Sequence, residues 1–214
     1  TTAELQTAVN LWVSDNATAL VTYGEINTWD VSLITNMSNL FLNQTTFNDD
    51  IGNWDVSNVT TMSQTFRNAK SFSQDLSGWD VSNVTSMYAL FTSSDNPGFN
   101  GDISTWDVSN VTNMGEMFRY ATNFNRDISG WDVSGVTNMN LMYDQAHDFN
   151  QDISTWDVSS VTNMGNMFMN AYSFNQDISA WDVSGVGTFG QMFQNTPLSE
   201  DNQCAIHSAF SSNG

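Results

Sequence analysis

The sequence predicts an α/β fold: a single right-handed solenoid of about seven coils of 25 residues, with one parallel sheet and short helical turns on the opposite face. The main observation is that the segment Trp-Asp-Val-Ser occurs seven times, at steps of 25, 25, 27, 25, 25 and 25 residues. A fixed period between about 20 and 50 residues is typical of proteins whose repeats stack on one another. The seven copies start at Trp29, Trp54, Trp79, Trp106, Trp131, Trp156 and Trp181.

The second observation is the spacing of apolar residues within each copy. In the fifth copy, Trp131 and Val133 alternate with Asp132 and Ser134. This period of two predicts a short strand that turns tryptophan and valine inward and aspartate and serine outward. After Thr137 the apolar residues recur at three- and four-residue steps, which predicts a helical or 3₁₀ turn. Inward columns of Trp, Val, Met and Phe are therefore expected to form the core.

The ends of the chain depart from the repeat. Residues 1–22 predict an N-terminal helical cap, with a helix over 2–14 that begins at an N-cap threonine, Thr2. The repeats occupy residues 23–198, and residues 199–214 predict a C-terminal capping helix and a frayed tail. Caps are expected because an open end of a stack exposes core and unpaired backbone groups.

Composition limits the functions that the chain can have. The 214 residues contain 23 acidic and 4 basic side chains, for a net charge of −19. Such a charge argues against binding to nucleic acid or to anionic membranes, both of which require Lys and Arg. No apolar run is long enough to cross a bilayer, and no signal peptide is visible, so we expect an excised domain or a mature secreted protein. The single cysteine, Cys204, leaves the redox compartment open.

Two acidic residues recur in every copy, and the one that follows tryptophan is itself followed two residues later by serine. The first row follows each tryptophan and comprises Asp30, Asp55, Asp80, Asp107, Asp132, Asp157 and Asp182. The second row precedes the predicted strand and comprises Glu25, Asp50, Asp75, Asp102, Asp127, Asp152 and Asp177. Stacked strands would place neighbouring charges ~4.8 Å apart, where they repel by roughly 1 kcal/mol even in water.

Two interpretations of these rows remain open. In the structural one, which we expect for the second row, each aspartate accepts hydrogen bonds from nearby backbone N–H groups or from serine. In the other, the first row and its serines form a solvent-facing binding surface that gathers calcium, with Asp107, Asp132 and Asp157 as the candidate ligands. The compact loop of strong calcium sites is absent, so binding should be weak and no cofactor is required. The serines of this surface are Ser57, Ser82, Ser109, Ser134 and Ser159.

Other recurring residues have simpler explanations. A threonine column predicts helix N-caps, with ice binding as the alternative. His147 and His207 are isolated from other metal ligands and are expected to be surface residues. Catalysis by carboxylates needs one differentiated pair, whereas here the same acid recurs in every copy, so we do not expect an enzyme. The threonine column comprises Thr35, Thr60, Thr85, Thr112, Thr137 and Thr162.

The repeat, written W-D-V-S-x-V-T-x-M-x-x-M-F-x-x-A-x-x-F-N-x-D-I-S, resembles the BspA-like leucine-rich-repeat surface proteins. Its apolar positions i, i+3, i+5 and i+8 also match the leucine-rich-repeat pattern. The best copies are Trp106–Ser129 and Trp156–Ser179, and the resemblance covers about residues 3–195. It implies secreted or surface-anchored proteins, some of them adhesins, and supplies no catalytic residues.

Taken together, these patterns predict a non-catalytic binding or adhesion module outside the cell or at its surface. Its acidic sheet face would contact an extracellular protein with a cationic surface, or a polysaccharide through bridging calcium. The alternative is a structural spacer within a larger surface protein, and ice binding is a distant third. No nucleic acid and no membrane insertion are expected.

Overall fold

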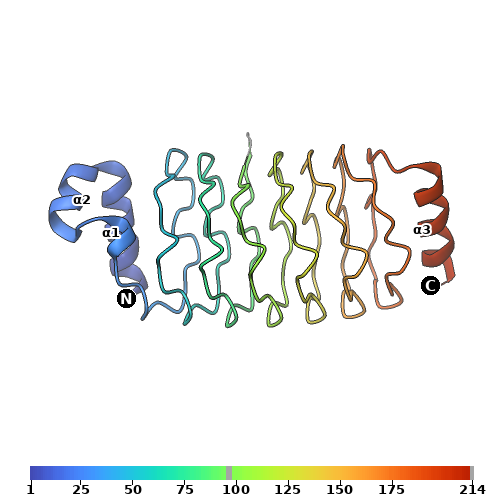
Figure 1. Cartoon of the computed structure of the whole chain (residues 1–214), viewed down its shortest axis with the longest axis horizontal. Coiled ribbons are helices and arrows are strands. Elements are labelled where there is room, and N and C mark those ends of the chain that lie inside the picture. Colours follow the sequence, from blue (N-terminus) through green and yellow to red (C-terminus); the bar gives the residue numbers. More distant parts are fainter. Residues whose placement is uncertain (95–97, 213–214) are drawn as a thin grey trace.

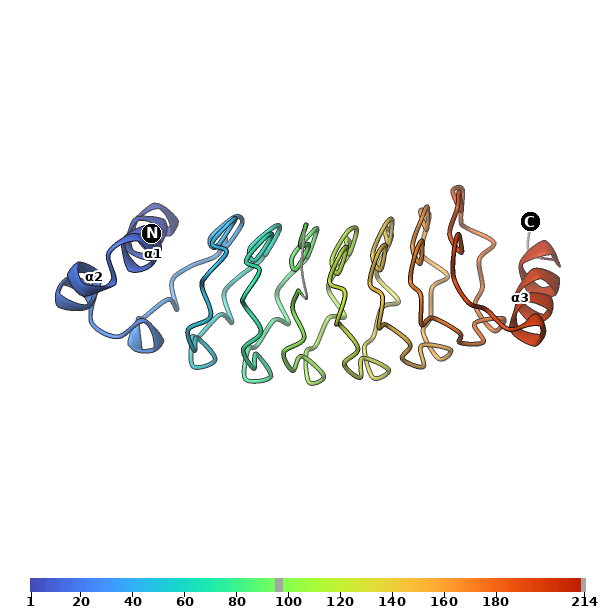
Figure 2. The ribbon, with the colours of Figure 1, turned by 90° about the horizontal axis from the view of Figure 1, so that it is seen from above.

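The computed structural model describes residues 1–94 and 98–212. Coils stack along one long axis, with helices at both ends of the row (Figure 1). Seen from above, the coils are again side by side and nearly parallel (Figure 2). The helical elements are α1 (Thr2–Ser14), α2 (Asn16–Tyr23), the 3₁₀ helix η1 (Ile26–Thr28) and α3 (Glu200–Ser212).

The predicted parallel sheet is wrong, and with it the leucine-rich-repeat solenoid. Within the described residues, β pairing is limited to a single parallel bridge between neighbouring coils. These bridges lie seven residues after each tryptophan and not at the Trp-Asp-Val-Ser segment. They join, in order, Asn36, Thr61, Ser86, Asn113, Asn138, Asn163 and Thr188.

Local hydrogen bonds explain why no strand forms at Trp-Asp-Val-Ser. In the fifth coil, the carboxylate of Asp132 accepts the backbone N–H of Ser134 at 3.0 Å. The N–H of Val136 then donates to the carbonyl of Val133 at 2.9 Å and closes a turn. Because these N–H groups are bonded within their own coil, they are not available to a ladder between coils.

The predicted helical turn on the opposite face is also wrong, because a series of β-turns takes its place. In the fifth coil, Met142 N–H donates to the carbonyl of Met139 at 3.2 Å. The intervening residue, Leu141, instead donates its N–H to Gly165 of the next coil at 2.9 Å. Turns within a coil therefore alternate with bonds between coils, and this alternation excludes the continuous i to i−4 pattern of an α-helix.

The alternation requires left-handed backbone at regular positions. Leu141 has φ +57° and Gln145 has φ +63°. Non-glycine residues in this region cost roughly 1–2 kcal/mol each, with Asn the best tolerated. The bonds to the next coil and the packing beneath the turns hold this conformation. The same region is occupied by Asn39, Asn43, Gln64, Asn68, Ala89, Glu116, Tyr120, Asn166, Asn170, Gln191 and Asn195.

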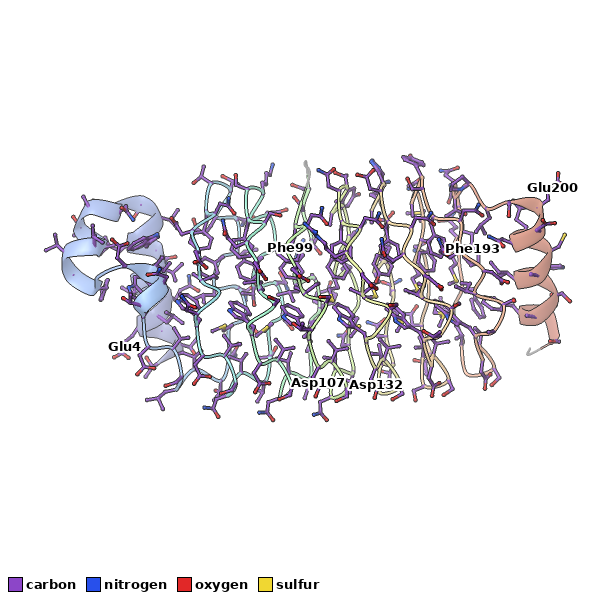
Figure 3. The ribbon with its side chains drawn as sticks, in the orientation of Figure 1. Glu4, Phe99, Asp107, Asp132, Phe193 and Glu200 are labelled. Carbon is purple, nitrogen blue, oxygen red and sulfur yellow. The ribbon has the colours of Figure 1, made fainter. Side chains whose placement is uncertain are left out.

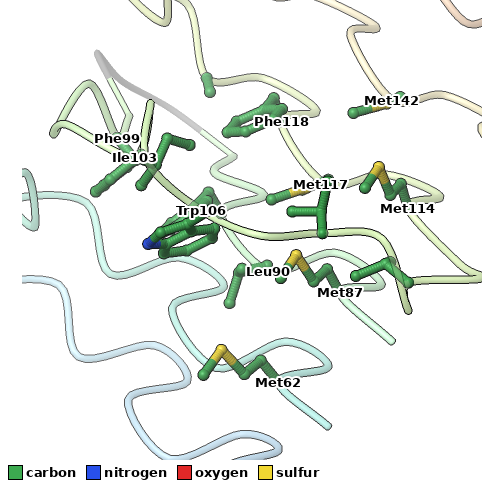
Figure 4. Close-up of a cluster of buried hydrophobic side chains, with 14 of the residues drawn as sticks. Met62, Met87, Leu90, Phe99, Ile103, Trp106, Met114, Met117, Phe118 and Met142 are labelled. Atoms are coloured by element: carbon green, nitrogen blue, oxygen red, sulfur yellow. The ribbon is translucent and has the colours of Figure 1, made fainter. Parts of the chain in front are cut away.

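The prediction that tryptophan and valine point inward is confirmed. Trp131 is 3% exposed and Val133 is 1% exposed. Equivalent rings stack from coil to coil: the Trp131 and Trp156 centroids are 6.5 Å apart, with planes 3° from parallel. Methionines, including Met87 and Met114, fill the space beside the rings (Figure 4). The core is thus a set of continuous side-chain columns that run through the whole stack.

Every indole of the repeat after Trp29 also forms a hydrogen bond between coils. Nε1 of Trp54 donates to the carbonyl of Ile26 at 2.8 Å, and Nε1 of Trp181 donates to the carbonyl of Ile153 at 3.1 Å. A buried indole N–H needs such a partner, and here the carbonyl comes from the preceding coil. The same bond is made by Trp79, Trp106, Trp131 and Trp156.

The terminal helices are close to where the sequence predicts them. The first helix spans Thr2–Ser14, and its N-cap is Thr1 rather than Thr2, in a capping box with Glu4. Nε1 of Trp12 donates to Asp49 of the first full coil at 3.0 Å, which fixes α1 on the stack. At the other end, α3 continues to Ser212, so the predicted fraying at residues 211–212 is wrong. Residues 95–97, within the 27-residue step, and residues 213–214 lie outside the described residues.

Tyr143 offers a direct test of core packing. It occupies a column that is otherwise phenylalanine, and its hydroxyl is buried and has no hydrogen-bond partner among the described residues. Removing an unsatisfied buried hydroxyl recovers a desolvation cost, so we expect Tyr143→Phe to raise the free energy of unfolding by about 1 kcal/mol. Urea unfolding checks this. A loss of stability in Tyr143→Phe would show that the hydroxyl is satisfied in solution.

Candidate functional site

The first aspartate row forms a continuous exposed line, which we call the acidic edge. Figure 3 shows Asp107 and Asp132 next to each other along one edge of the stack. The seven members of the acidic edge are Asp30, Asp55, Asp80, Asp107, Asp132, Asp157 and Asp182, and all are exposed.

Serine fixes the orientation of each carboxylate along this edge. Oδ1 of Asp132 accepts both the backbone N–H of Ser134 at 3.0 Å and its hydroxyl at 2.6 Å. Oδ2 accepts no hydrogen bond from the described residues. The same arrangement, with both serine donors, is found for Asp30 and Ser32, Asp55 and Ser57, Asp80 and Ser82, Asp107 and Ser109, and Asp157 and Ser159. At the last coil, Asp182 accepts the backbone N–H of Ser184.

The second row has similar local bonds, as expected from the sequence. Asp127 accepts the N–H and the hydroxyl of Ser129 at 3.0 and 2.7 Å. Asp50, which is followed by Gly52, accepts the glycine N–H at 2.9 Å. Glu25 differs, since its side chain does not cap η1. Local bonding therefore holds in both rows, including the first, for which the sequence left two interpretations open.

Hydrogen bonds outweigh repulsion between neighbouring carboxylates. The Ser134 hydroxyl and then its N–H lower the pKa of Asp132 below its ordinary value, and the charges of Asp107 and Asp157 raise it by less. Serine hydrogen bonds likewise lower the pKa values of Asp30, Asp55, Asp107, Asp157 and Asp182. The ionised form is thus the one that this fold stabilises.

The expected calcium ligands are not brought into one cluster. Asp107, Asp132 and Asp157 each come from a different coil, and each has one oxygen engaged by its own serine. Across residues 1–94 and 98–212, no three Asp, Glu, His or Cys side chains converge closely enough to hold a metal ion. The serine hydroxyls of Ser57, Ser82, Ser109, Ser134 and Ser159 point toward their own aspartates.

The threonine column does not cap helices, so that prediction is wrong. From Thr60 onward, each threonine hydroxyl of the column donates to the backbone carbonyl of the threonine in the preceding coil; for example, Thr137 donates to Thr112 at 3.1 Å. The backbone N–H of Thr137 donates to the same carbonyl at 2.9 Å. The column therefore stabilises contacts between coils, and its side chains remain exposed.

A buried charged cluster was missed by sequence reasoning. The Asp144 side chain is 1% exposed, and its Oδ2 accepts Arg119 Nε at 3.0 Å. Arg119 also pairs with Glu116 at 3.2 Å, and Glu116 accepts the Tyr88 hydroxyl at 2.6 Å. Burial raises the pKa of Asp144, and the Arg119 charge opposes that shift. The available signal was a change of charge at one repeat position: an aspartate stands at 144, where the preceding coil has Arg119 and the next coil has Met169.

The two histidines do not contribute to a metal site within the described residues. His147 contacts the ring of Tyr172, with centroids 4.7 Å apart, and pairs with Gln145 at 3.2 Å. His207 is an exposed residue of α3. Neither lies in a cluster of metal-ligating side chains among the described residues.

Acid is expected to destabilise the chain through the acidic edge. The folded pKa values of Asp107, Asp132 and Asp157 lie below the value of about 3.9 in an unfolded chain. The stabilisation is therefore complete above that pH and is lost as the pH falls through the lowered folded values. We expect the thermal midpoint to fall as the pH is lowered below about 4. Asp144 acts in the opposite direction, because its raised pKa makes its contribution decline as the pH rises.

Calorimetry at several pH values checks this prediction. The triple variant Ser109→Ala, Ser134→Ala, Ser159→Ala keeps the backbone donors but removes three hydroxyls. Its midpoint should depend less on pH than that of the parent chain. A midpoint that stays constant or rises in acid would show that repulsion along the edge dominates.

Stacked 25-residue coils with an almost uniform acidic edge define the chain as a repeat protein of one elongated architecture. A family model described as "Mycoplasma protein of unknown function, DUF285" matches it twice, over residues 11–97 and 93–205, and the chain belongs to this family. The match does not confirm the BspA-like leucine-rich-repeat resemblance. No curated protein and no solved structure matches the chain. In the part of the chain that the structure describes, helices long and apolar enough to cross a bilayer are absent.

Proposed function

We propose that the chain is a non-catalytic binding or adhesion module located outside the cell or at its surface, and that the acidic edge is its contact surface. The observation that carries this proposal is the fixed orientation of the edge carboxylates. Serine engages Oδ1 of Asp107, Asp132 and Asp157, while Oδ2 of each has no partner among the described residues. A row of oriented, ionised oxygens suits a partner that carries a row of positive groups.

Preorganisation makes this surface better suited to binding than a random set of surface acids. A side chain that is already immobilised loses little conformational entropy when a partner arrives, and that loss otherwise weakens an interface. Complementary charge also speeds encounter and disfavours anionic competitors. The occupant can be a protein with spaced Lys or Arg residues, or a polysaccharide held through calcium ions shared by neighbouring carboxylates.

A structural spacer is the second candidate, and one observation favours it. The same aspartate–serine bond recurs in coil after coil and is complete without any partner, as in Asp55 and Ser57. Asparagine could keep most of this bond, because its side-chain oxygen also accepts N–H and O–H donors. A spacer would therefore tolerate loss of the charges.

The deciding experiment compares two triple variants. The first, Asp107→Asn, Asp132→Asn, Asp157→Asn, neutralises the centre of the acidic edge, and the matched control neutralises Asp127, Asp152 and Asp177 of the second row. Binding of an oligolysine peptide and of calcium is measured by calorimetry. The proposal expects the first variant to lose affinity and the control to keep it. Equal affinity of both variants and the parent chain would support the spacer instead.

A further inference from the structure

The backbone bonds between coils have a common direction on the turn-rich face. At the last junction, the N–H groups of Met164, Asn166, Phe168 and Asn170 donate to carbonyls of the following coil at 2.8–3.0 Å. The same four donors recur at equivalent positions in the preceding coils. The turn-rich face therefore ends in carbonyl oxygens at the N-terminal end of the stack and in N–H groups at the C-terminal end. Aligned peptide groups of this kind leave partial negative charge at one end and partial positive charge at the other.

The two ends of the stack differ in whether these terminal backbone groups have hydrogen-bond partners. At the N-terminal end, α1 supplies side-chain donors: the Thr2 hydroxyl bonds the carbonyl of Asn36 at 3.1 Å, and Gln6 Nε2 bonds that of Leu40 at 2.9 Å. At the C-terminal end, four N–H groups have no acceptor among the described residues. They belong to Phe189, Gln191, Phe193 and Asn195, each 25 residues after a donor of the preceding coil.

The last coil keeps the conformation that aims these N–H groups out of the stack. Its turns repeat those of the earlier coils, with φ +57° at Gln191 and +61° at Asn195. A methyl group added at Gly190 would meet nothing within 4 Å, whereas one added at Gly165 would lie 3.3 Å from Thr188 of the next coil. The outer side of the last coil is thus open at Gly190.

Residues of α3 and of the last coil line an open cavity of about 290 Å³. Phe193 lines it and also carries one of the unpaired N–H groups. The remaining walls are Thr196, Leu198, Gln203, Ile206, His207 and Phe210. Gln203 and His207 are exposed, so the cavity reaches solvent.

The charge of the cavity is unusual for this chain. The protein has 23 acidic and 4 basic residues, yet no carboxylate lines this cavity. Its polar groups are an amide, a hydroxyl, an imidazole and backbone N–H, and its body is apolar. Apolar walls with a few convergent polar groups are typical of small-molecule sites.

We propose that this cavity binds a small carboxylate with an apolar tail, such as a medium-chain aliphatic acid. The tail packs against Leu198, Ile206 and Phe210, and the carboxylate accepts the N–H of Phe193, the one of the four outward donors whose residue lines the cavity. This site is independent of the acidic edge. It lies at the one end of the stack where the aligned peptide groups favour an anion.

Titration with octanoate, followed by ¹H–¹⁵N correlation spectra, tests the inference. The amide signal of Phe193 should move, while that of Phe168, already bonded to Met192, should not. Octanol, which has the same tail without the charge, should bind at least roughly tenfold more weakly. Equal shifts with both ligands, or shifts confined to another surface, would overturn the proposal.

Cavity-filling variants complete the test. Leu198→Trp places bulk in the cavity, and Phe210→Trp does so from α3; the matched control, Leu20→Trp, adds the same ring on α2. Octanoate binding should be lost in whichever cavity variant retains the parent circular dichroism spectrum, and it should persist in the control. Unchanged binding in a folded cavity variant would exclude this site.

Discussion

Replacing Trp131 by alanine is expected to lower the free energy of unfolding by about 3–5 kcal/mol. The indole stacks on Trp106 and Trp156 with centroids 6.5 Å away on each side. Its Nε1 also donates to the carbonyl of Ile103 at 3.3 Å. The substitution removes a large buried side chain, leaves a cavity in a closely packed column and removes one of the two hydrogen bonds that the Ile103 carbonyl accepts. Urea unfolding followed by far-ultraviolet circular dichroism measures the loss.

The position of Trp131 in the middle of the stack adds a second expectation. Each coil contacts only its neighbours, so a weak junction in the centre can separate the two halves into independent cooperative units. Unfolding of Trp131→Ala should therefore broaden or resolve into two steps. Trp131→Phe, which keeps a ring but loses the indole bond, should cost less and keep one transition.

Trp29→Ala is the matched control at the end of the stack. Trp29 is only partly buried and packs against Trp12 and Tyr23 from the helical cap. Its loss should cost less than the loss of Trp131 and should leave a single transition. If both alanine variants lost the same stability, burial in the column would not be the source of the effect.

The contrast between the columns and the sheet shows what periodicity can predict. Inward residues are specified by hydrophobicity alone, so Trp131, Val133 and Met139 are placed correctly whether the backbone is a strand or a turn. The strand itself rested on only four alternating residues. Such a short alternation does not distinguish a strand from a turn, and the hydrogen bond between Asp132 and Ser134 favours the turn.

The left-handed positions could not be predicted from residue type. Asn166 fits such a position, but Leu141 and Glu116 occupy the equivalent sites in other coils. These side chains disfavour positive φ, and the bonds to the next coil and the packing beneath the turns hold them there. The residue types in one coil therefore do not predict a backbone conformation that the neighbouring coil imposes.

The candidate sites also differ in how far the sequence predicts them. Exposure of the acidic edge followed from its place after an inward tryptophan, and serine two residues on indicated local bonding. The pairing of Arg119 with Asp144 depends on two coils lying in register. The spacing of residues in the sequence does not by itself show which side chains of neighbouring coils form a pair. The cavity beside Phe193 depends on how α3 crosses the last coil, and that crossing has no repeat to predict it.

Gly101→Ala is the second substitution for which a large effect is expected. A Cβ at Gly101 would lie 2.0 Å from the carbonyl oxygen of Gln74 and 2.8 Å from the ring of Phe99. The closer contact is with backbone, which cannot move without disturbing the preceding coil. Overpacking of this kind typically lowers the free energy of unfolding by about 1–3 kcal/mol. Because the contact is with fixed backbone, we expect a loss at the upper end of this range for Gly101→Ala.

Equivalent positions hold larger residues in other coils, such as Gln151, whose Nε2 reaches the carbonyl of Asn125 at 2.9 Å. At Gly101 the backbone lies too close to the Gln74 carbonyl oxygen for a side chain to fit. Gly130→Ala is the matched control, because a Cβ there meets nothing within 4 Å. Calorimetry should show a marked loss for Gly101→Ala and little change, or a gain of up to roughly 1 kcal/mol, for Gly130→Ala. Equal midpoints for the two variants would mean that the coils separate enough at 101 to admit a methyl group, and that the longer step is not tightly packed in solution.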